Sequence, residues 1–229
     1  QELWDKLYSE FGVKSILSGN TGVQMGGWFR NEIKSAIDFK GIKMRIPGIG
    51  AEIVNRLGGT AVNMPAGEIM PALQQGVIDA AEWVGPWVDK ISGFHKITKY
   101  YYGPGVHEPG TANEFIMDIT KWIELPKSLK EIIINSCHSV YIESLSEYLY
   151  QNSLSLYELE KKYKVKINHF PADLSKQMFK ISREVVESFS NLGNIHKEIY
   201  MSWEKALTQF NQYQDFSDYG YIKGRLLSL

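Results

Sequence analysis

The chain has 229 residues, 44% of them hydrophobic and 13% aromatic, and its 25 basic and 26 acidic side chains leave a formal net charge of −1. These values are typical of a globular protein and exclude disordered and collagen-like chains, and with no Lys/Arg cluster they also argue against nucleic acid as a partner. The single cysteine, Cys137, excludes an internal disulfide framework and a cysteine-rich zinc site.

The N-terminal part of the sequence predicts a helix followed by a strand. Leu3, Leu7 and Phe11 recur at the spacing of one helix face, and Gly12 is placed to end that helix. Residues 13–17 form the predicted strand, which we expect the turn-forming residues 18–22 to terminate.

From residue 39 onward, short strands and short helices alternate. The predicted strands cover residues 43–46, 60–64 and 77–81, and the predicted helices between them cover residues 51–57 and 65–75. Such βαβ units indicate an α/β protein with a mainly parallel sheet. Ligands of these sheets bind beyond the carboxyl ends of the strands, so the candidate binding segments are residues 20–24, 45–48, 64–67 and 82–83.

The second half of the chain is predicted to be mainly helical. Strands are expected at residues 100–102, 114–118 and 165–170, and helices at residues 128–163, 171–189 and 195–213, before a tail rich in Tyr, Gln and Asp. The last of these helices is amphipathic. We therefore expect it to pack within the chain or across a dimer.

Two charged residues lie where predicted strands end. Arg45 is suited to grip a carboxylate, because its planar guanidinium donates two parallel hydrogen bonds and stays charged; a solvated arginine on an edge strand is the alternative. Glu82 would be costly to bury unless a cation such as Arg45 or a metal ion compensates it, and a glutamate facing water is its alternative. Trp83 and Trp87 could wall a pocket or belong to the core.

Other chemical signatures are incomplete. His107 and Glu108 begin like a zinc-protease motif, but the second histidine four residues on is missing. The remaining histidines have no metal-ligand spacing, no serine lies in a nucleophile elbow, and Cys137 lies inside a predicted helix. No phosphate-binding loop or dinucleotide fingerprint is present. This pattern favours a binding protein over an enzyme.

Three ordered motifs carry a resemblance to a known family. They are residues 19–29 (GNTGVQMGGWF), residues 43–48 (KMRIPG) and residues 73–86 (LQQGVIDAAEWVGP). Together they closely resemble the periplasmic substrate-binding proteins of tripartite ATP-independent (TRAP) transporters, in particular the branch that binds 2-oxo acids and related monocarboxylates. The resemblance covers essentially the whole chain. It implies a periplasmic-binding-protein type II-like fold, with two α/β lobes joined by hinge-crossing strands and closing on a carboxylate.

The resemblance also implies roles for individual residues. The family's carboxylate-binding arginine falls on Arg45, and the ligands of a metal ion beside the substrate fall on the side chains of Gln24 and Glu82 and the backbone carbonyl of Trp83. Asn20 and Trp87 are further candidate substrate contacts, and Glu108 is a candidate fourth metal ligand. The branch also implies dimerisation through the C-terminal helices.

The charge balance of such a site separates the candidate cations. Arg45, Glu82, a substrate carboxylate and a monovalent cation such as Na⁺ sum to zero. If Glu108 also reaches the ion, neutrality instead requires a divalent ion, and Ca²⁺ suits a shell made only of oxygen atoms. The sequence leaves Na⁺ and Ca²⁺ open.

The resemblance also suggests a division of the chain. Residues 1–20 are expected to be a remnant of the first lobe, 21–81 part of the second lobe, 82–108 a first-lobe segment crossing the hinge, 109–170 second lobe again, and 171–229 C-terminal helices for packing or dimerisation. The sequence starts at Gln1 without an initiator Met, a signal peptide or a transmembrane helix. We expect a periplasmic protein whose signal peptide and much of whose first lobe are not in this sequence.

The sequence therefore predicts a subunit that captures a small 2-oxo or 2-hydroxy monocarboxylate, pyruvate-like, with a metal ion, and delivers it to a membrane permease without performing chemistry. One alternative is the ligand-sensing ectodomain of a signalling receptor with the same fold. The other is a metal-dependent lyase or hydrolase of 2-oxo acids with Glu82 or Glu108 as base, for which the sequence offers no convincing His or Lys near those acids.

Overall fold

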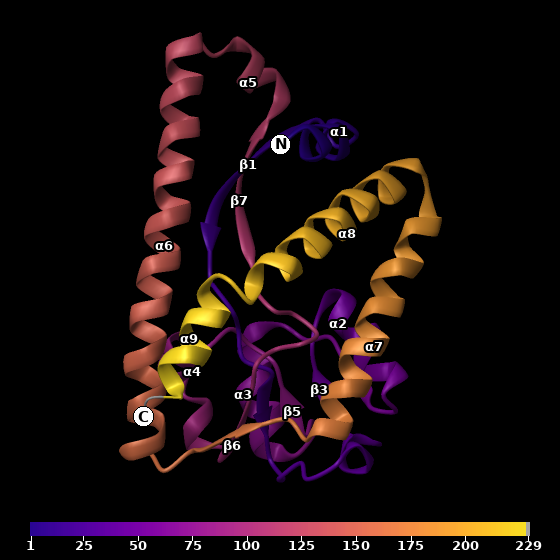
Figure 1. The fold of residues 1–229 in the computed structure, drawn as a ribbon, viewed down its shortest axis with the longest axis vertical. Coiled ribbons are helices and arrows are strands. Elements are labelled where there is room, and N and C mark those ends of the chain that lie inside the picture. The colour runs from indigo at the N-terminus through magenta and orange to yellow at the C-terminus, as the bar shows by residue number, and fades with distance from the viewer. Residues whose placement is uncertain (228–229) are drawn as a thin grey trace.

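A computed structural model describes residues 1–227 and contains two β-sheets flanked by helices (Figure 1). In the smaller sheet, β1 (Val13–Asn20) pairs antiparallel with β7 (Ala112–Asp118). The larger sheet has the order β4-β3-β5-β2-β6-β8. Its strands are β2 (Gly27–Phe29), β3 (Lys43–Arg45), β4 (Thr60–Val62), β5 (Ala80–Ala81), β6 (Tyr100–Gly103) and β8 (Lys166–His169).

The helices flank these sheets, and the longest, α6, runs beside β1 and β7 (Figure 1). They are α1 (Glu2–Ser9), α2 (Gly48–Arg56), α3 (Ala66–Gln75), α4 (Pro86–Ser92), α5 (Ile119–Glu124), α6 (Lys127–Lys161), α7 (Ala172–Phe189), α8 (Asn194–Gln214) and α9 (Asp218–Leu226), with short 3-10 turns at Ala36–Phe39, Phe94–Lys96 and Ser190–Leu192. No helix among the described residues is long and apolar enough to cross a membrane.

Strand directions bring the ends of four strands to one edge of the larger sheet. β3 is parallel to β4 and β5, which confirms the predicted βαβ units, whereas β2 is antiparallel to both β5 and β6. The carboxyl ends of β3, β5 and β6 therefore lie at the same edge as the beginning of β2. This edge is where ligands of such sheets bind.

Alternating side chains on the central strands divide the core into two layers. Phe29 and Tyr102 pack with α2 and α7 on one face, and Trp28 and Tyr101 pack with α3 and α6 on the other. The two-residue period of a strand explains this alternation. Both faces of the sheet are covered, so the loops at its edge are fixed by a buried scaffold.

Gly27 is required at the start of β2. Its φ is +125°, and a Cβ there would lie 2.9 Å from the carbonyl oxygen of Ala81 on the neighbouring strand. Only glycine adopts this conformation at low cost and permits this approach. The two strands that carry Gln24 and Glu82 at their ends are thereby held close together.

Several predicted boundaries were wrong because pairing partners decide them. β1 continues through residues 18–20, which were expected to break it, because a bulge between Leu17 and Gly19 lets it keep pairing with β7. The predicted strand at residues 77–81 is reduced to Ala80–Ala81. Among the strands and α-helices of the described residues, four were not predicted, namely β2, α4, α5 and the helix α9 in the polar tail.

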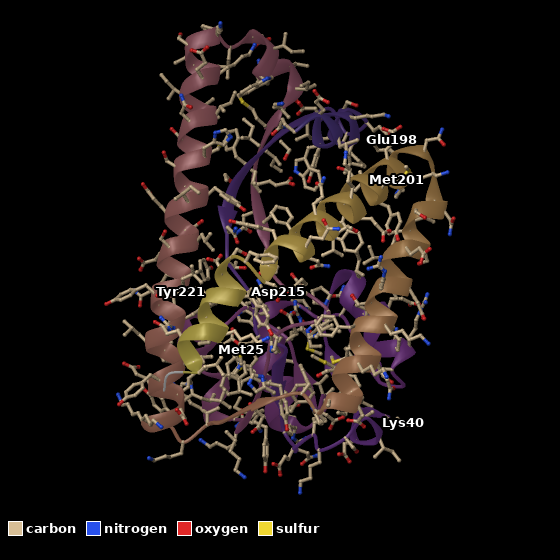
Figure 2. The ribbon with its side chains drawn as sticks, in the orientation of Figure 1. Met25, Lys40, Glu198, Met201, Asp215 and Tyr221 are labelled. Carbon is tan, nitrogen blue, oxygen red and sulfur yellow. The ribbon has the colours of Figure 1, made fainter. Side chains whose placement is uncertain are left out.

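The C-terminal helices fold back over the molecule. α8 extends from α7 toward α1, where Glu198 of α8 forms an ion pair with Lys6 of α1 (Figure 2). The Lys6 Nζ atom lies 2.7 Å from Glu198 Oε2. α9 then turns toward the lower part of α6 in the same view. The amphipathic helix predicted at residues 195–213 is therefore present as α8, and it packs against α1, α7 and α9.

One predicted segment boundary disagrees with the sheet. Residues 82–108 were expected to belong to a different lobe from residues 21–81, but β6 lies within that segment and pairs with β2 on one side and β8 on the other. The rows of backbone hydrogen bonds place β6 in the same sheet as β2 to β5. The remaining division into lobes stays a prediction.

Candidate functional site

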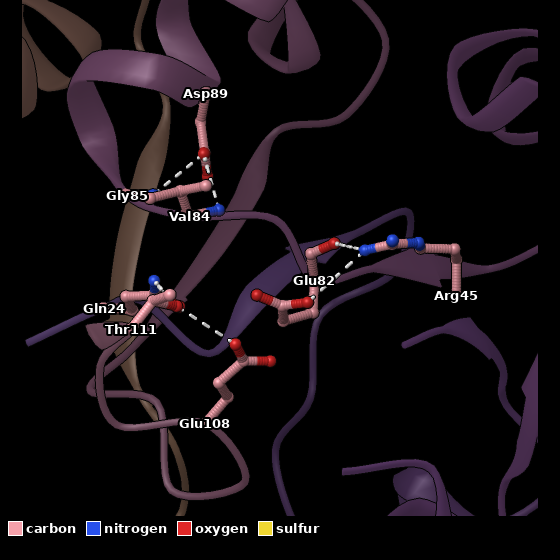
Figure 3. A network of polar contacts seen from close by, with 8 residues as sticks. All are labelled: Gln24, Arg45, Glu82, Val84, Gly85, Asp89, Glu108 and Thr111. Carbon is pink, nitrogen blue, oxygen red and sulfur yellow. Dashed lines mark hydrogen bonds and ion pairs between the residues drawn. The ribbon is translucent and has the colours of Figure 1, made fainter. Parts of the chain in front are cut away.

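Four predicted site residues meet at the sheet edge described above. Arg45 is the last residue of β3, Glu82 follows β5 directly, Gln24 precedes β2, and Glu108 lies in the loop after β6. Figure 3 shows these side chains converging from their separate strands. Their meeting follows from the strand order, because segments distant in the sequence end at the same edge.

Arg45 and Glu82 form a buried pair. The Nη1 atom of Arg45 donates a 3.0 Å hydrogen bond to the backbone oxygen of Glu82 and lies 3.5 Å from its Oε2 atom. The side chain of Arg45 is 11% exposed and that of Glu82 only 1%. The guanidinium also lies over the Trp83 ring, with Cζ 5.2 Å from the centroid. The predicted pairing of Arg45 with Glu82 is present in this geometry.

The electrostatic environment of Glu82 is unfavourable to its charge. Its pKa is raised to about 8, mainly by burial and also by the neighbouring charges of Glu108 and Asp89, while the charge of Arg45 acts in the opposite direction. One guanidinium thus does not offset the desolvation and the nearby carboxylates. A cation close to these carboxylates would favour the ionised form of Glu82.

Two threonines hold the side-chain amide of Gln24. Its Nε2 atom donates to Thr21 Oγ1 at 3.0 Å and to Thr111 Oγ1 at 2.8 Å, and the Thr111 hydroxyl donates to Glu108 Oε1 at 3.2 Å. Both amide protons are therefore engaged, and Gln24 Oε1 is left as the free end of the amide. Thr111 links the side chains of Gln24 and Glu108 (Figure 3).

Asp89 fixes the backbone that follows Trp83. Its Oδ1 atom accepts hydrogen bonds from the backbone N–H groups of Val84 (3.1 Å) and Gly85 (2.9 Å). Its Oδ2 atom accepts from Trp28 Nε1 (2.8 Å) and the Tyr101 hydroxyl (2.7 Å). Burial raises the pKa of Asp89 to about 6, against these four hydrogen bonds, which lower it. The carboxyl thereby joins the turn after Glu82 to the core.

Polar atoms without a hydrogen-bond partner gather at this edge. Among the described residues, buried side-chain atoms that make no hydrogen bond include Gln24 Oε1, Glu82 Oε1, Arg45 Nε and Trp83 Nε1. Buried polar groups normally have partners, so a cluster of unpaired ones indicates a ligand site. The two oxygen atoms suit Na⁺ or Ca²⁺, and Arg45 Nε is a donor for a carboxylate.

The residues present thus fit the cation that the sequence predicts. The predicted donors are a glutamine oxygen, a carboxylate and the backbone carbonyl of Trp83, rather than a set of acidic side chains and histidines. Consistent with that composition, residues 1–227 contain no group of three or more His, Cys, Asp or Glu side chains placed to hold a metal ion.

Two predicted contacts lie elsewhere. Asn20 donates from its amide to the Tyr141 hydroxyl of α6 at 2.7 Å, and the Trp87 ring packs edge-on against Tyr148, also of α6, with centroids 5.2 Å apart. Within the described part of the chain, no hydrogen bond or ion pair joins either side chain to Arg45 or Glu82. Both side chains contact α6, and their role as substrate contacts stays a prediction.

The structure also draws in residues that the sequence had not assigned to the site, among them His107, which the sequence offered only as part of an incomplete zinc-protease motif. Thr21, Thr111 and Asp89 take part through hydrogen bonds, and His107 is buried beside Glu108 with neither ring nitrogen paired. Burial lowers the pKa of His107 to about 4. For Asp89, the one sequence signal available was its position as an acidic residue within a largely apolar stretch. The threonines had none, because their importance depends on strand pairing.

A relative of known sequence is a periplasmic binding protein. The chain is 36% identical over 215 residues to a monocarboxylate 2-oxoacid-binding periplasmic protein from Nostoc sp.; the match covers 93% of this chain and 59% of that protein. The chain thus spans less than two thirds of the length of this relative.

Solved structures give the same result at the level of the fold. A TRAP periplasmic solute-binding protein from Colwellia psychrerythraea, with bound calcium and pyruvate, superposes with a TM-score of 0.92 at 38% identity, covering 97% of this chain and 68% of that chain. One from Pseudoalteromonas atlantica, with bound sodium and pyruvate, gives 0.90 at 35% identity and the same coverages. The expected periplasmic-binding-protein fold is confirmed.

The family model gives the assignment itself. Residues 1–192 match the DctP family, described as bacterial extracellular solute-binding protein family 7. This is a family of transporter solute-binding proteins and not of enzymes. The match confirms the resemblance drawn from the three sequence motifs. The chain belongs to family 7 of the bacterial extracellular solute-binding proteins, the DctP family of TRAP solute-binding proteins.

Proposed function

We propose that this chain is the solute-binding part of a TRAP transporter and binds a small 2-oxo or 2-hydroxy monocarboxylate together with a cation. Arg45 holds the ligand's carboxylate, and Gln24, Glu82 and the Trp83 carbonyl hold the cation. The observation that carries this proposal is the group of buried, unpaired atoms Gln24 Oε1, Glu82 Oε1 and Arg45 Nε at one sheet edge. A bound anion and cation would satisfy all three.

Arg45 is prepared for one carboxylate. Its Nη1 atom is engaged by the Glu82 backbone, its Nε atom is unpaired, and Trp83 covers one face of the guanidinium. These contacts orient the planar group before the ligand arrives, so little rotamer entropy is lost on binding. The cation, when bound, supplies positive charge that favours the ionised form of Glu82 and attracts the ligand's oxygen atoms.

Charge balance favours Ca²⁺ over Na⁺ in this site. Glu108 raises the pKa of Glu82 electrostatically and is joined to Gln24 through Thr111, so it belongs to the same cluster. Arg45, Glu82, Glu108 and the ligand carboxylate sum to a charge of −2. A divalent cation neutralises that charge, whereas a monovalent one leaves a buried negative charge.

Isothermal titration calorimetry tests the proposal directly. The protein, expressed from its complete reading frame and stripped with a chelator, is titrated with pyruvate, lactate, a longer 2-oxo acid and a dicarboxylate, each with Ca²⁺, Na⁺ or neither. We expect monocarboxylate binding that requires a cation and is tighter with Ca²⁺. Equal affinity with and without cations would contradict the shared site.

The transporter context supplies the partners. We propose that the protein acts in the periplasm, that the ligand closes two lobes joined by hinge strands, and that a TRAP membrane permease accepts the closed form. We also propose a homodimer through the C-terminal helices, since α8 and α9 expose large apolar side chains. They include Met201, Phe210, Tyr213 and Tyr221, and Phe216 is exposed in the turn between the two helices.

A receptor ectodomain with the same fold remains the second candidate function. A membrane-spanning segment and a signalling domain in the complete reading frame would favour it over a transporter subunit. Incubating the protein with pyruvate and Ca²⁺ and following the acid by NMR tests the lyase or hydrolase alternative. We expect the acid to remain unchanged.

A further inference from the structure

A cavity adjoins the proposed ligand site. It has a volume of about 930 Å³ and lies between α1, the start of α2, the loop after β6, and helices α7 and α8. Its walls include the turn at Pro47 and Gly48, which follows Arg45 by two residues, and Glu108 of the proposed cation site. The cavity therefore lies beside Glu108 and beside the turn that follows β3.

One polar side chain of this cavity is unusual. His107 lines it, is only 6% exposed, and forms no hydrogen bond through either Nδ1 or Nε2 to any described residue. A Cβ on Gly50 would lie 3.6 Å from the Cβ of His107, so the histidine stands against the first turn of α2. Many of its neighbours along the cavity wall are apolar, among them Leu3, Val106 and Ile199.

An imidazole buried in this way is costly unless something pairs with it. Buried polar side chains are almost always hydrogen-bonded, and the other unpaired buried atoms of this region are Trp83 Nε1 and the three atoms proposed to bind the carboxylate and the cation. His107 precedes Glu108 and shares the cavity with it. A ligand oxygen that reaches the cavity beside Glu108 would satisfy the imidazole as well.

We propose that His107 is a further ligand-contacting residue, which hydrogen-bonds an oxygen atom of the bound carboxylate from the cavity side of the site. This inference rests on the proposed function. It adds a contact from the loop after β6 to those from β3 and β5. The ligand is then held from three strand ends.

The test compares two buried histidines in the protein expressed from its complete reading frame. His107→Leu removes the hydrogen bond, and His107→Gln keeps a donor and an acceptor. The matched control is His95→Leu, because His95 is also buried with an unpaired ring nitrogen but packs on Tyr163 at 4.2 Å and does not line the cavity. Calorimetry measures pyruvate affinity with Ca²⁺, and urea unfolding checks stability.

We expect His107→Leu to weaken pyruvate binding about tenfold, His107→Gln to restore it to within about threefold, and His95→Leu to leave it unchanged. Wild-type affinity in His107→Leu, or an equal loss in His95→Leu, would overturn the inference. Should His107→Leu not fold, ¹⁵N NMR of the unaltered protein decides: pyruvate must shift the ring resonances of His107 and not those of His95. Failure of the unaltered protein to bind any monocarboxylate would overturn the proposed function instead.

Discussion

Replacing Arg45 with alanine separates binding from folding in this protein. The guanidinium is the proposed partner of the ligand carboxylate, and truncating one member of a buried, hydrogen-bonded charge pair costs about 2 to 5 kcal/mol of binding free energy. That range corresponds to a loss of affinity of roughly 30-fold to several thousand-fold. We expect the affinity of Arg45→Ala for pyruvate to be lower than that of the unaltered protein by a factor in this range or by more.

The loss of stability should be smaller than the loss of binding. Removing one partner of a buried ion pair usually costs about 3 to 5 kcal/mol, because the other charge is left unpaired. Without a cation, however, the pKa of Glu82 is about 8, so this carboxyl is mostly protonated at pH 7 and leaves no buried anion behind. The cation-free variant should therefore lose less than about 3 kcal/mol of unfolding free energy.

Calorimetry and urea unfolding at pH 7 measure the two quantities, with Arg56→Ala as the control. Arg56 is 40% exposed and pairs at 2.7 Å with Glu52 one helical turn away, so its removal should alter neither quantity by more than about 0.5 kcal/mol. An Arg45→Ala protein that is stable and binds pyruvate as tightly as the unaltered protein would refute the proposed carboxylate site.

Three further predictions concern the neighbouring residues. Glu108→Gln removes one negative charge and should shift cation preference from Ca²⁺ toward Na⁺ in calorimetry; an unchanged preference would remove Glu108 from the cation site. Thr111→Val frees the Gln24 amide and should weaken cation binding by roughly 10-fold, whereas Thr111→Ser should not, and equal effects of both would contradict an orienting hydroxyl. Protonation of Asp89 stabilises the folded state, because the pKa of this carboxyl is about 6 in the folded protein against an ordinary 3.8. This contribution to stability is fully present below pH 3.8 and is lost as the pH rises through 6. Between pH 3.8 and 7, the free energy of unfolding of Asp89→Asn, measured in urea, should therefore rise by about 3 kcal/mol relative to that of the unaltered protein. A difference between the two proteins that does not change with pH would contradict the protonation of Asp89.

The sequence by itself determined the family, the α/β class and most of the elements. Periodicity was sufficient for α7 and α8, because amphipathic helices repeat their pattern over several turns, and the length of the helical run also indicated α6. The motifs around Gln24, Arg45 and Glu82 were sufficient for the family, because they are local and ordered along the chain. Short elements such as β2 and α4 were missed, since a few residues carry too little periodicity to be recognised.

Only the tertiary structure decided which residues share the site. Strand order brings Glu108 to Glu82 and places Thr111 on Gln24, whereas packing against α6 takes up Asn20 and Trp87. Burial then determines which of these groups lack partners, as it does for His107. The physical reason is that hydrogen bonding and desolvation depend on neighbours distant in the sequence, and sheet pairing alone makes them neighbours.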